Sequence, residues 1–172
     1  MKQVIPFLAL LLTGGVLHAQ DTFTLPEAKM TAGQSKSYYV GAGFTQKILH
    51  VNTEWVNPYG IAYAKVGAFL NDDYPLGTQV GFRYPAYLNG KNLNGYYLGA
   101  YGGHIDSRVV DGKDKGRWGG GVDLAYVRLS SERLSILSIG IGAGEKLQTA
   151  DGHTIAEVEP RLQFSYTLSV GL

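Results

Sequence analysis

The residues best suited to chemistry follow one another in His104-Ile-Asp106-Ser107, where an imidazole, a carboxylate and a hydroxyl lie close in sequence. A hydroxyl nucleophile needs a base within hydrogen-bond reach and a further group that orients the base. In an extended chain His104 and Asp106 share one face, whereas Ser107 points to the other. We therefore interpret this segment as a polar strand end that enters a loop, and we assign no catalytic residue.

Metal and cofactor sites find little support. The histidines are His18, His50, His104 and His153, and no two of them have metal-ligand spacing. The segment Asp111-Gly-Lys-Asp114-Lys-Gly116 is similar to a calcium loop only in its Asp and Gly residues, because lysines stand where oxygen ligands are needed. Cys is absent, which excludes disulfides, thiolate zinc sites and thiol nucleophiles. We expect no cofactor and no metal ion.

Composition limits the class of protein. The chain has 172 residues and is 45% hydrophobic, which fits one folded domain. Its 15 Lys and Arg residues are balanced by 14 Asp and Glu residues, so it lacks the basic field that nucleic acid binding requires. The 24 Gly and 12 Tyr residues are the unusual counts.

Residues 1–19 have the pattern of a secretory signal peptide. Lys2 is followed by the apolar run Val4–Leu12 and by small residues that lead to a cleavage site after Ala19. An uncleaved anchor helix is the alternative, because residues 3–20 carry no charge. Residues 20–36 show no clear period, and we interpret them as a leader or plug-like segment of the mature chain.

The rest of the chain alternates with a period of two. In the segment Arg161–Leu172 every even position is apolar, and every odd position after Arg161 is small or polar. This alternation is typical of strands with two different faces. The recurring pattern predicts eight strands, over residues 37–45, 48–56, 60–71, 77–88, 95–105, 117–129, 134–146 and 155–172. One long bent strand over residues 37–56 is the alternative at the start of the chain.

The predicted connections alternate in length. Short turns at 57–60, 89–94 and 130–133 are expected at one end, and longer polar loops at 71–76, 106–116 and 147–154 at the other. This layout is typical of a closed antiparallel up-and-down transmembrane β-barrel formed by residues 37–172. Gly140, Gly142 and Gly144 are expected to let a lumen side chain or a neighbouring strand approach closely.

The alternation of apolar and polar residues does not by itself determine which face of each strand points into the barrel. A soluble, lipocalin-like periplasmic barrel would hold the apolar face inside, around a ligand, and would need many charges outside. Here the polar face consists mainly of small and uncharged residues, which favours a narrow polar lumen and an apolar surface in lipid. Its charged residues form the predicted polar network of the lumen: Glu54, Lys65, Arg83, Asp123, Glu157, Glu159 and Arg161. We expect these charges to pair with one another.

With these features the sequence resembles the small eight-stranded outer-membrane β-barrel proteins of Gram-negative bacteria. The resemblance rests on the signal peptide, the alternation from Tyr38 onward, the run 89–97 and the final strand Leu162–Leu172. It implies insertion by the barrel assembly machinery, contact with outer-membrane lipid and lipopolysaccharide, and periplasmic termini. Members commonly end in an aromatic residue, so with Leu172 in that place recognition would depend on Phe164 and Tyr166.

The function expected from these features is structural or one of surface interaction. An unknown extracellular ligand would meet the loops near Asp72, Asp111 and Asp151. A narrow channel or a carrier for small or hydrophobic molecules is one alternative, with Arg83, Glu157 and Glu159 along the route.

An enzyme that modifies lipid A is another alternative. The lipid A deacylases and palmitoyltransferases, which have a similar architecture, place a Ser and a His near the membrane surface. His104 and Ser107 would be the matching pair here, although the His-x-Ser pattern of the deacylases is absent.

Overall fold

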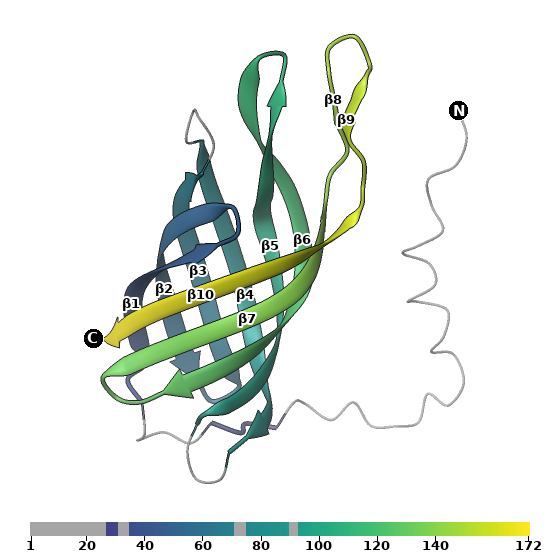
Figure 1. The fold of residues 1–172 in the computed structure, drawn as a ribbon. Coiled ribbons are helices and arrows are strands. Elements are labelled where there is room, and N and C mark those ends of the chain that lie inside the picture. The colour runs from purple at the N-terminus through teal and green to yellow at the C-terminus, as the bar shows by residue number, and fades with distance from the viewer. Residues whose placement is uncertain (1–26, 31–34, 71–74, 90–92) are drawn as a thin grey trace, which may run out of the picture.

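The computed structural model describes residues 27–30, 35–70, 75–89 and 93–172 (Figure 1). The predicted signal peptide, most of the predicted leader and Asp72 lie outside these residues. Eight strands form a closed antiparallel barrel: β1 (Tyr38–Thr45), β2 (Ile48–Asn57), β3 (Gly60–Phe69), β4 (Leu76–Leu88), β5 (Gly95–Val110), β6 (Lys113–Leu129), β7 (Arg133–Gly144) and β10 (Pro160–Gly171). A separate small hairpin consists of β8 (Leu147–Gln148) and β9 (Thr154–Ala156).

The barrel closes by pairing its last strand with its first. From β1 to β7 each strand pairs with the next one along the chain, and β10 joins β7 to β1, where Ala42 lies opposite Leu168. The predicted all-β, up-and-down barrel of eight strands is therefore confirmed. No helix in the described part of the chain is long and apolar enough to cross a bilayer.

The two ends of the barrel differ. The lower end in Figure 1 carries the short turns at 57–60 and 130–133, together with the start of β1 and the end of β10. The upper end carries the β1–β2 turn and two hairpins, β5–β6 and β8–β9, which project beyond the barrel wall. A bond from the Ala150 N–H to Asp111 Oδ2, at 3.4 Å, links the tips of these hairpins.

The prediction of a loop over residues 106–116 is wrong. β5 and β6 continue through these residues as a paired ladder that ends at the pair Val110–Lys113. A two-residue turn closes this hairpin, and both of its residues have positive φ, 51° at Asp111 and 74° at Gly112. Asp-Gly is the residue pair that such tight hairpin turns prefer. A β-bulge between His104 and Asp106 separates the projecting part from the barrel wall.

The last predicted strand, 155–172, also differs from the structure. It is interrupted between β9 and β10, and residues 157–159 belong to no strand. Within the barrel ladder, β10 begins at Pro160, which pairs with Ala143. A proline at the first residue of a strand is a usual position, because no ladder N–H is required of it there.

The facing predicted for the apolar residues is confirmed. Large apolar side chains point out of the wall on all eight barrel strands, and Val122 is a typical case at 62% exposed. We call this surface the apolar belt: Val40, Leu49, Val51, Val66, Val80, Phe82, Leu98, Val122, Leu124, Leu137, Ile139, Ile141, Leu162, Phe164, Leu168 and Val170. On β5, Tyr97 is buried inside, whereas Tyr96 and Leu98 are exposed.

The interior is divided along the barrel axis. The upper part is polar, and the lower end is filled by an apolar core of inward side chains. This lower core comprises Met30, Tyr39, Val56, Ile61, Leu93, Tyr97, Ala125, Val127, Leu129, Leu134 and Ile136. Burial of these side chains closes the lower end with apolar groups that need no hydrogen-bond partner.

Residues 27–30 from the predicted leader take part in this closure. The Met30 N–H donates to Pro58 O at 3.1 Å, and the Met30 side chain, 4% exposed, lies in the lower core. The Tyr97 hydroxyl is 3.9 Å from Met30 Sδ. Beside it, the Lys29 ammonium lies over the Tyr84 ring, 5.0 Å from the centroid.

Truncation of the Met30 side chain tests whether the leader is part of the fold. We expect Met30→Ala to lower the free energy of unfolding by about 2–4 kcal/mol, because it leaves a cavity in the lower core. Lys29→Ala is the matched control, with a loss of about 0.5–1 kcal/mol from an exposed cation–π contact. Both losses are measurable by urea denaturation, and equal small losses would show that the leader does not stabilise the barrel.

Candidate functional site

The polar lumen is built by strand alternation. Each barrel strand directs every second residue inward, so the polar positions of β2, β3, β4, β6, β7 and β10 converge on the axis. The buried polar residues of this band are His50, Asn52, Glu54, Lys65, Gln79, Arg83, Asp123, Ser138, Ser165, Thr167 and Ser169. Four of the predicted network residues, namely Glu54, Lys65, Arg83 and Asp123, are therefore inside.

An ion pair inside the lumen joins β4 to β6 over Gly99 of the intervening strand β5. Arg83 Nη2 lies 2.6 Å from Asp123 Oδ2, and Arg83 Nε donates to the same oxygen at 3.2 Å. Arg83 is 1% exposed and Asp123 is 7% exposed, so water screens the pair very little. The guanidinium also reaches Ser138 Oγ at 3.5 Å, and Ser138 shares a hydrogen bond with Ser165 at 2.8 Å. These contacts tie four strands together.

The Tyr63 ring contacts both lumen cations. The Arg83 guanidinium is 4.3 Å from the centroid of its ring, and the Lys65 ammonium is 5.0 Å from the same centroid. The electron-rich face of an aromatic ring attracts a cation. Tyr63 therefore stabilises two like charges that would otherwise repel each other inside a narrow barrel.

Glu54 lies in a second group of polar contacts, between β2 and β10. Its Oε1 accepts hydrogen bonds from Asn52 Nδ2 and, at 3.2 Å, from Ser169 Oγ. Asn52 Nδ2 also donates to Ser169 Oγ at 2.9 Å. Glu54 is thus held by neutral donors, and within the described residues no cation forms an ion pair with it, contrary to the pairing we expected.

Glycines let lumen side chains and neighbouring strands approach closely, as the sequence predicted for Gly140, Gly142 and Gly144. A Cβ on Gly140 would lie 2.9 Å from Asp123 Cβ, and one on Gly142 would lie 2.5 Å from the Tyr101 hydroxyl. On β5, a Cβ on Gly99 would collide with Asp123 Oδ1.

What remains of the lumen is small. A void of about 10 Å³ lies among Tyr63, Lys65, Arg83 and Tyr101, which is about the space of one water molecule. His50 is buried above this level, and neither of its ring nitrogens has a partner in the described residues. At the level of the ion pair, the described side chains leave no cavity for a ligand of several atoms.

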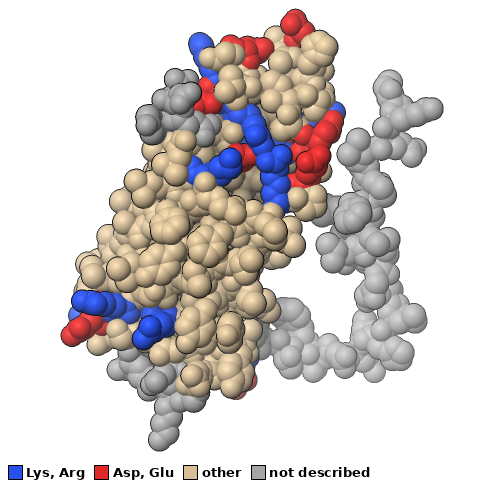
Figure 2. Space-filling view, viewed as in Figure 1, with Lys and Arg blue, Asp and Glu red and all other residues tan. Residues whose placement is uncertain are grey.

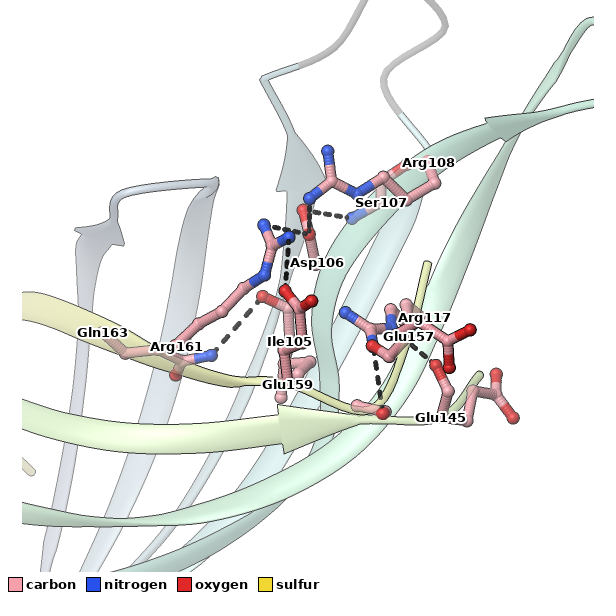
Figure 3. Close-up of polar contacts among 11 residues, drawn as sticks. Ile105, Asp106, Ser107, Arg108, Arg117, Glu145, Glu157, Glu159, Arg161 and Gln163 are labelled. Atoms are coloured by element: carbon pink, nitrogen blue, oxygen red, sulfur yellow. Dashed lines mark hydrogen bonds and ion pairs between the residues drawn. The ribbon is translucent and has the colours of Figure 1, made fainter. Parts of the chain in front are cut away.

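A separate polar cluster lies at the upper rim (Figure 3). Asp106 is buried there, and the Arg108 and Arg161 side chains point toward it, with nitrogens 3.0 and 3.6 Å from Asp106 Oδ2. Arg117 is fully buried and donates to three backbone carbonyls: Glu145 at 2.6 Å, Gly144 at 3.0 Å, and Glu157. These bonds attach the segment before β10 to the rim.

The other three predicted network residues lie at this rim and are exposed. Arg161 Nη2 is 4.0 Å from Glu159 Oε2, and Glu157 Oε1 is 3.3 Å from Lys146 Nζ. Strand alternation does not apply to Glu157 and Glu159, because residues 157–159 belong to no strand. The pairing expected between these glutamates and Lys65 or Arg83 is absent from the described ion pairs.

The structure does not bring His104, Asp106 and Ser107 together as a catalytic group. The His104 ring packs 4.4 Å from the Trp118 ring, and its Nδ1 accepts a bond from the Thr78 N–H at 3.2 Å. Asp106 is engaged by arginines, and the buried Ser107 hydroxyl has no partner among the described residues. The bulge at this point explains why His104 and Asp106 do not share a face, contrary to the alternation expected.

Metal ligands are not gathered either. No three His, Asp or Glu side chains within the described ranges lie close enough to hold an ion. The segment 111–116 forms the turn and the first residues of β6.

Two contributors, Arg117 and Met30, were missed from the sequence. The alternation along β6 could have identified Arg117 as an inward residue, because it lies on the same face of the strand as Gly119, Gly121 and Asp123. No comparable signal marks Met30, because residues 20–36 have no period.

No protein-family model, no curated protein and no solved structure matches this chain.

A double-mutant cycle tests the lumen ion pair. Arg83→Met leaves a buried carboxylate without its partner, and we expect it to lower the free energy of unfolding by about 3–5 kcal/mol. The variant Arg83→Met/Asp123→Asn should recover at least about 1 kcal/mol relative to the sum of the single losses. Arg161→Met, which removes exposed rim contacts, is the control and should lose no more than about 1 kcal/mol. Strictly additive losses at 83 and 123 would contradict the pairing.

Proposed function

We propose that this protein is an outer-membrane β-barrel with a structural or surface-interaction role and a lumen filled by side chains. The observation that carries the proposal is the apolar belt, which surrounds the barrel and leaves large apolar side chains exposed on every barrel strand. Soluble monomers rarely expose a continuous apolar surface of this extent. A closed barrel also pairs its backbone groups within its wall, as a segment in hydrocarbon must.

The edges of the belt support the same orientation. Figure 2 shows charged side chains gathered toward the two ends of the molecule, with a broad band between them that carries none on the face shown. At the lower edge Trp55, Tyr59, Tyr87 and Tyr96 are exposed, and at the upper edge Trp118 is exposed. Such aromatic side chains are typical of the two membrane interfaces.

The filled lumen favours a structural or adhesive role over transport. The lower core closes one end with apolar side chains, and the Arg83–Asp123 pair lies within the polar band. A lipocalin-like carrier would require an apolar cavity, whereas the interior beside the ion pair leaves about 10 Å³.

The projecting hairpins are the proposed contact surface for an extracellular partner. They stand clear of the barrel at the end opposite the described start of β1 and end of β10 (Figure 1). Val109 on the β5–β6 hairpin is 58% exposed, and Val158, just after the β8–β9 hairpin, is 63% exposed. The bond from Ala150 to Asp111 links the two hairpin tips. In this proposal the upper end lies outside the cell and faces lipopolysaccharide, and the lower end lies in the periplasm. The signal peptide directs export of the chain, and the barrel assembly machinery inserts it into the outer membrane.

A matched pair of valines tests the lipid-facing belt. Val122→Arg puts a charge at mid-belt, and we expect it to destabilise the protein folded in lipid bilayers by about 2–4 kcal/mol. Val109→Arg, on the projecting hairpin, should change the stability by no more than about 0.5 kcal/mol. Denaturant titration of folding in liposomes measures both values, and an equal response at the two positions would contradict the proposal.

Planar-bilayer recording tests the filled lumen. We expect the inserted wild-type protein to give no discrete conductance steps, because the apolar lower core closes one end of the lumen. A general porin in the same bilayers serves as the positive control. Reproducible steps from this protein would overturn the filled-lumen role and favour the narrow channel.

A further inference from the structure

A shallow groove lies on the outer surface at the lower edge of the apolar belt. Its volume is about 490 Å³, and it spans the lower parts of β6, β7 and β10. Arg128 and Arg133 line it, and both point out of the barrel. In the ladders Arg128 lies opposite Ser135, which in turn lies opposite Leu168, so the groove runs across three neighbouring strands.

The two guanidiniums of the groove have no anionic partner among the described residues. In the part of the chain that the structure describes, neither Arg128 nor Arg133 has a carboxylate within 4.0 Å. The upper-rim arginines Arg108 and Arg161, in contrast, share the carboxylate of Asp106. A pair of unpaired guanidiniums beside an apolar surface favours an anion supplied from outside the chain.

The remaining lining divides the groove into a polar part and an apolar part. Ser130 and Ser135 line the polar part, and Ser135 Oγ donates to the Tyr166 hydroxyl at 3.4 Å. Leu168 lines the apolar part and is 49% exposed. A ligand that fits both parts carries an anionic head next to a hydrocarbon chain.

We propose that this groove binds an anionic glycerophospholipid, with its phosphate between Arg128 and Arg133 and an acyl chain along Leu168 and Tyr166. The inference rests on the proposed membrane orientation, which puts the lower edge of the belt at the headgroups of the periplasmic leaflet. Planar guanidiniums match phosphate oxygens through paired hydrogen bonds. Basic side chains at a membrane surface attract anionic lipid in the same way.

Native mass spectrometry from nonionic detergent micelles tests the site, with phosphatidylglycerol as the probe and phosphatidylcholine of identical chains as the comparison. We expect Arg128→Gln/Arg133→Gln to weaken phosphatidylglycerol binding about 30-fold, since each cation near the headgroups contributes about fivefold. Lys113→Gln/Lys115→Gln removes the same charge from the projecting hairpin and should leave binding unchanged. Arg128→Lys/Arg133→Lys should bind with intermediate affinity, because lysine keeps the charge but lacks the fork.

Each outcome distinguishes the lipid site from the membrane proposal. A heat-shifted, folded wild-type protein that binds both lipids equally, or whose affinity is the same in the two Gln variants, overturns the lipid site alone. Displacement of phosphatidylglycerol by an equal concentration of inorganic phosphate also overturns it, because the acyl chain would then contribute nothing. A protein that stays in the aqueous phase without a heat-shifted band overturns both.

Discussion

Closure of β10 on β1 is the constraint on which the rest of this structure depends. Once the ladder is continuous, the strands that form it have no unpaired edge, and every residue of the wall faces either the lumen or the surroundings. Eight strands leave a lumen only wide enough for side chains. That width explains why small residues such as Gly99 and Gly140 stand beside the Arg83–Asp123 pair, because larger residues would occupy the space of the carboxylate and its strand.

The two faces of the wall follow different rules. Inside, polar groups are held by one another in the upper part and are replaced by an apolar core below, where Met30 from outside the barrel ladder completes the packing. Outside, the apolar belt has no counterpart in the described chain to cover it. A lipid environment, as proposed, would supply that counterpart. Arg128 and Arg133 at the belt's lower edge, which form no ion pair with the described residues, fit the same orientation.

Much of the fold could be predicted from the sequence, because strand alternation is local. The strand number, the outward side of residues such as Val122, and the inward side of Glu54, Lys65, Arg83 and Asp123 all follow from a period of two. The ion-pair partner of a lumen residue does not follow from alternation. Alternation gives the face of Arg83 but not the strand register that brings it to Asp123, 40 positions away. The many charged residues of the segment 106–116 favoured the prediction of a loop over that of a hairpin with a turn at Asp111-Gly112. Alternation could not give the facing of Glu157 and Glu159, because these residues lie outside the ladder.

Cell fractionation combined with the gel mobility of the unboiled protein shows whether the apolar belt faces lipid. We predict recovery in the outer-membrane fraction and a band that shifts on heating, because a closed barrel in lipid stays folded in mild detergent. Recovery in the soluble periplasm, with no heat-dependent shift, would contradict it.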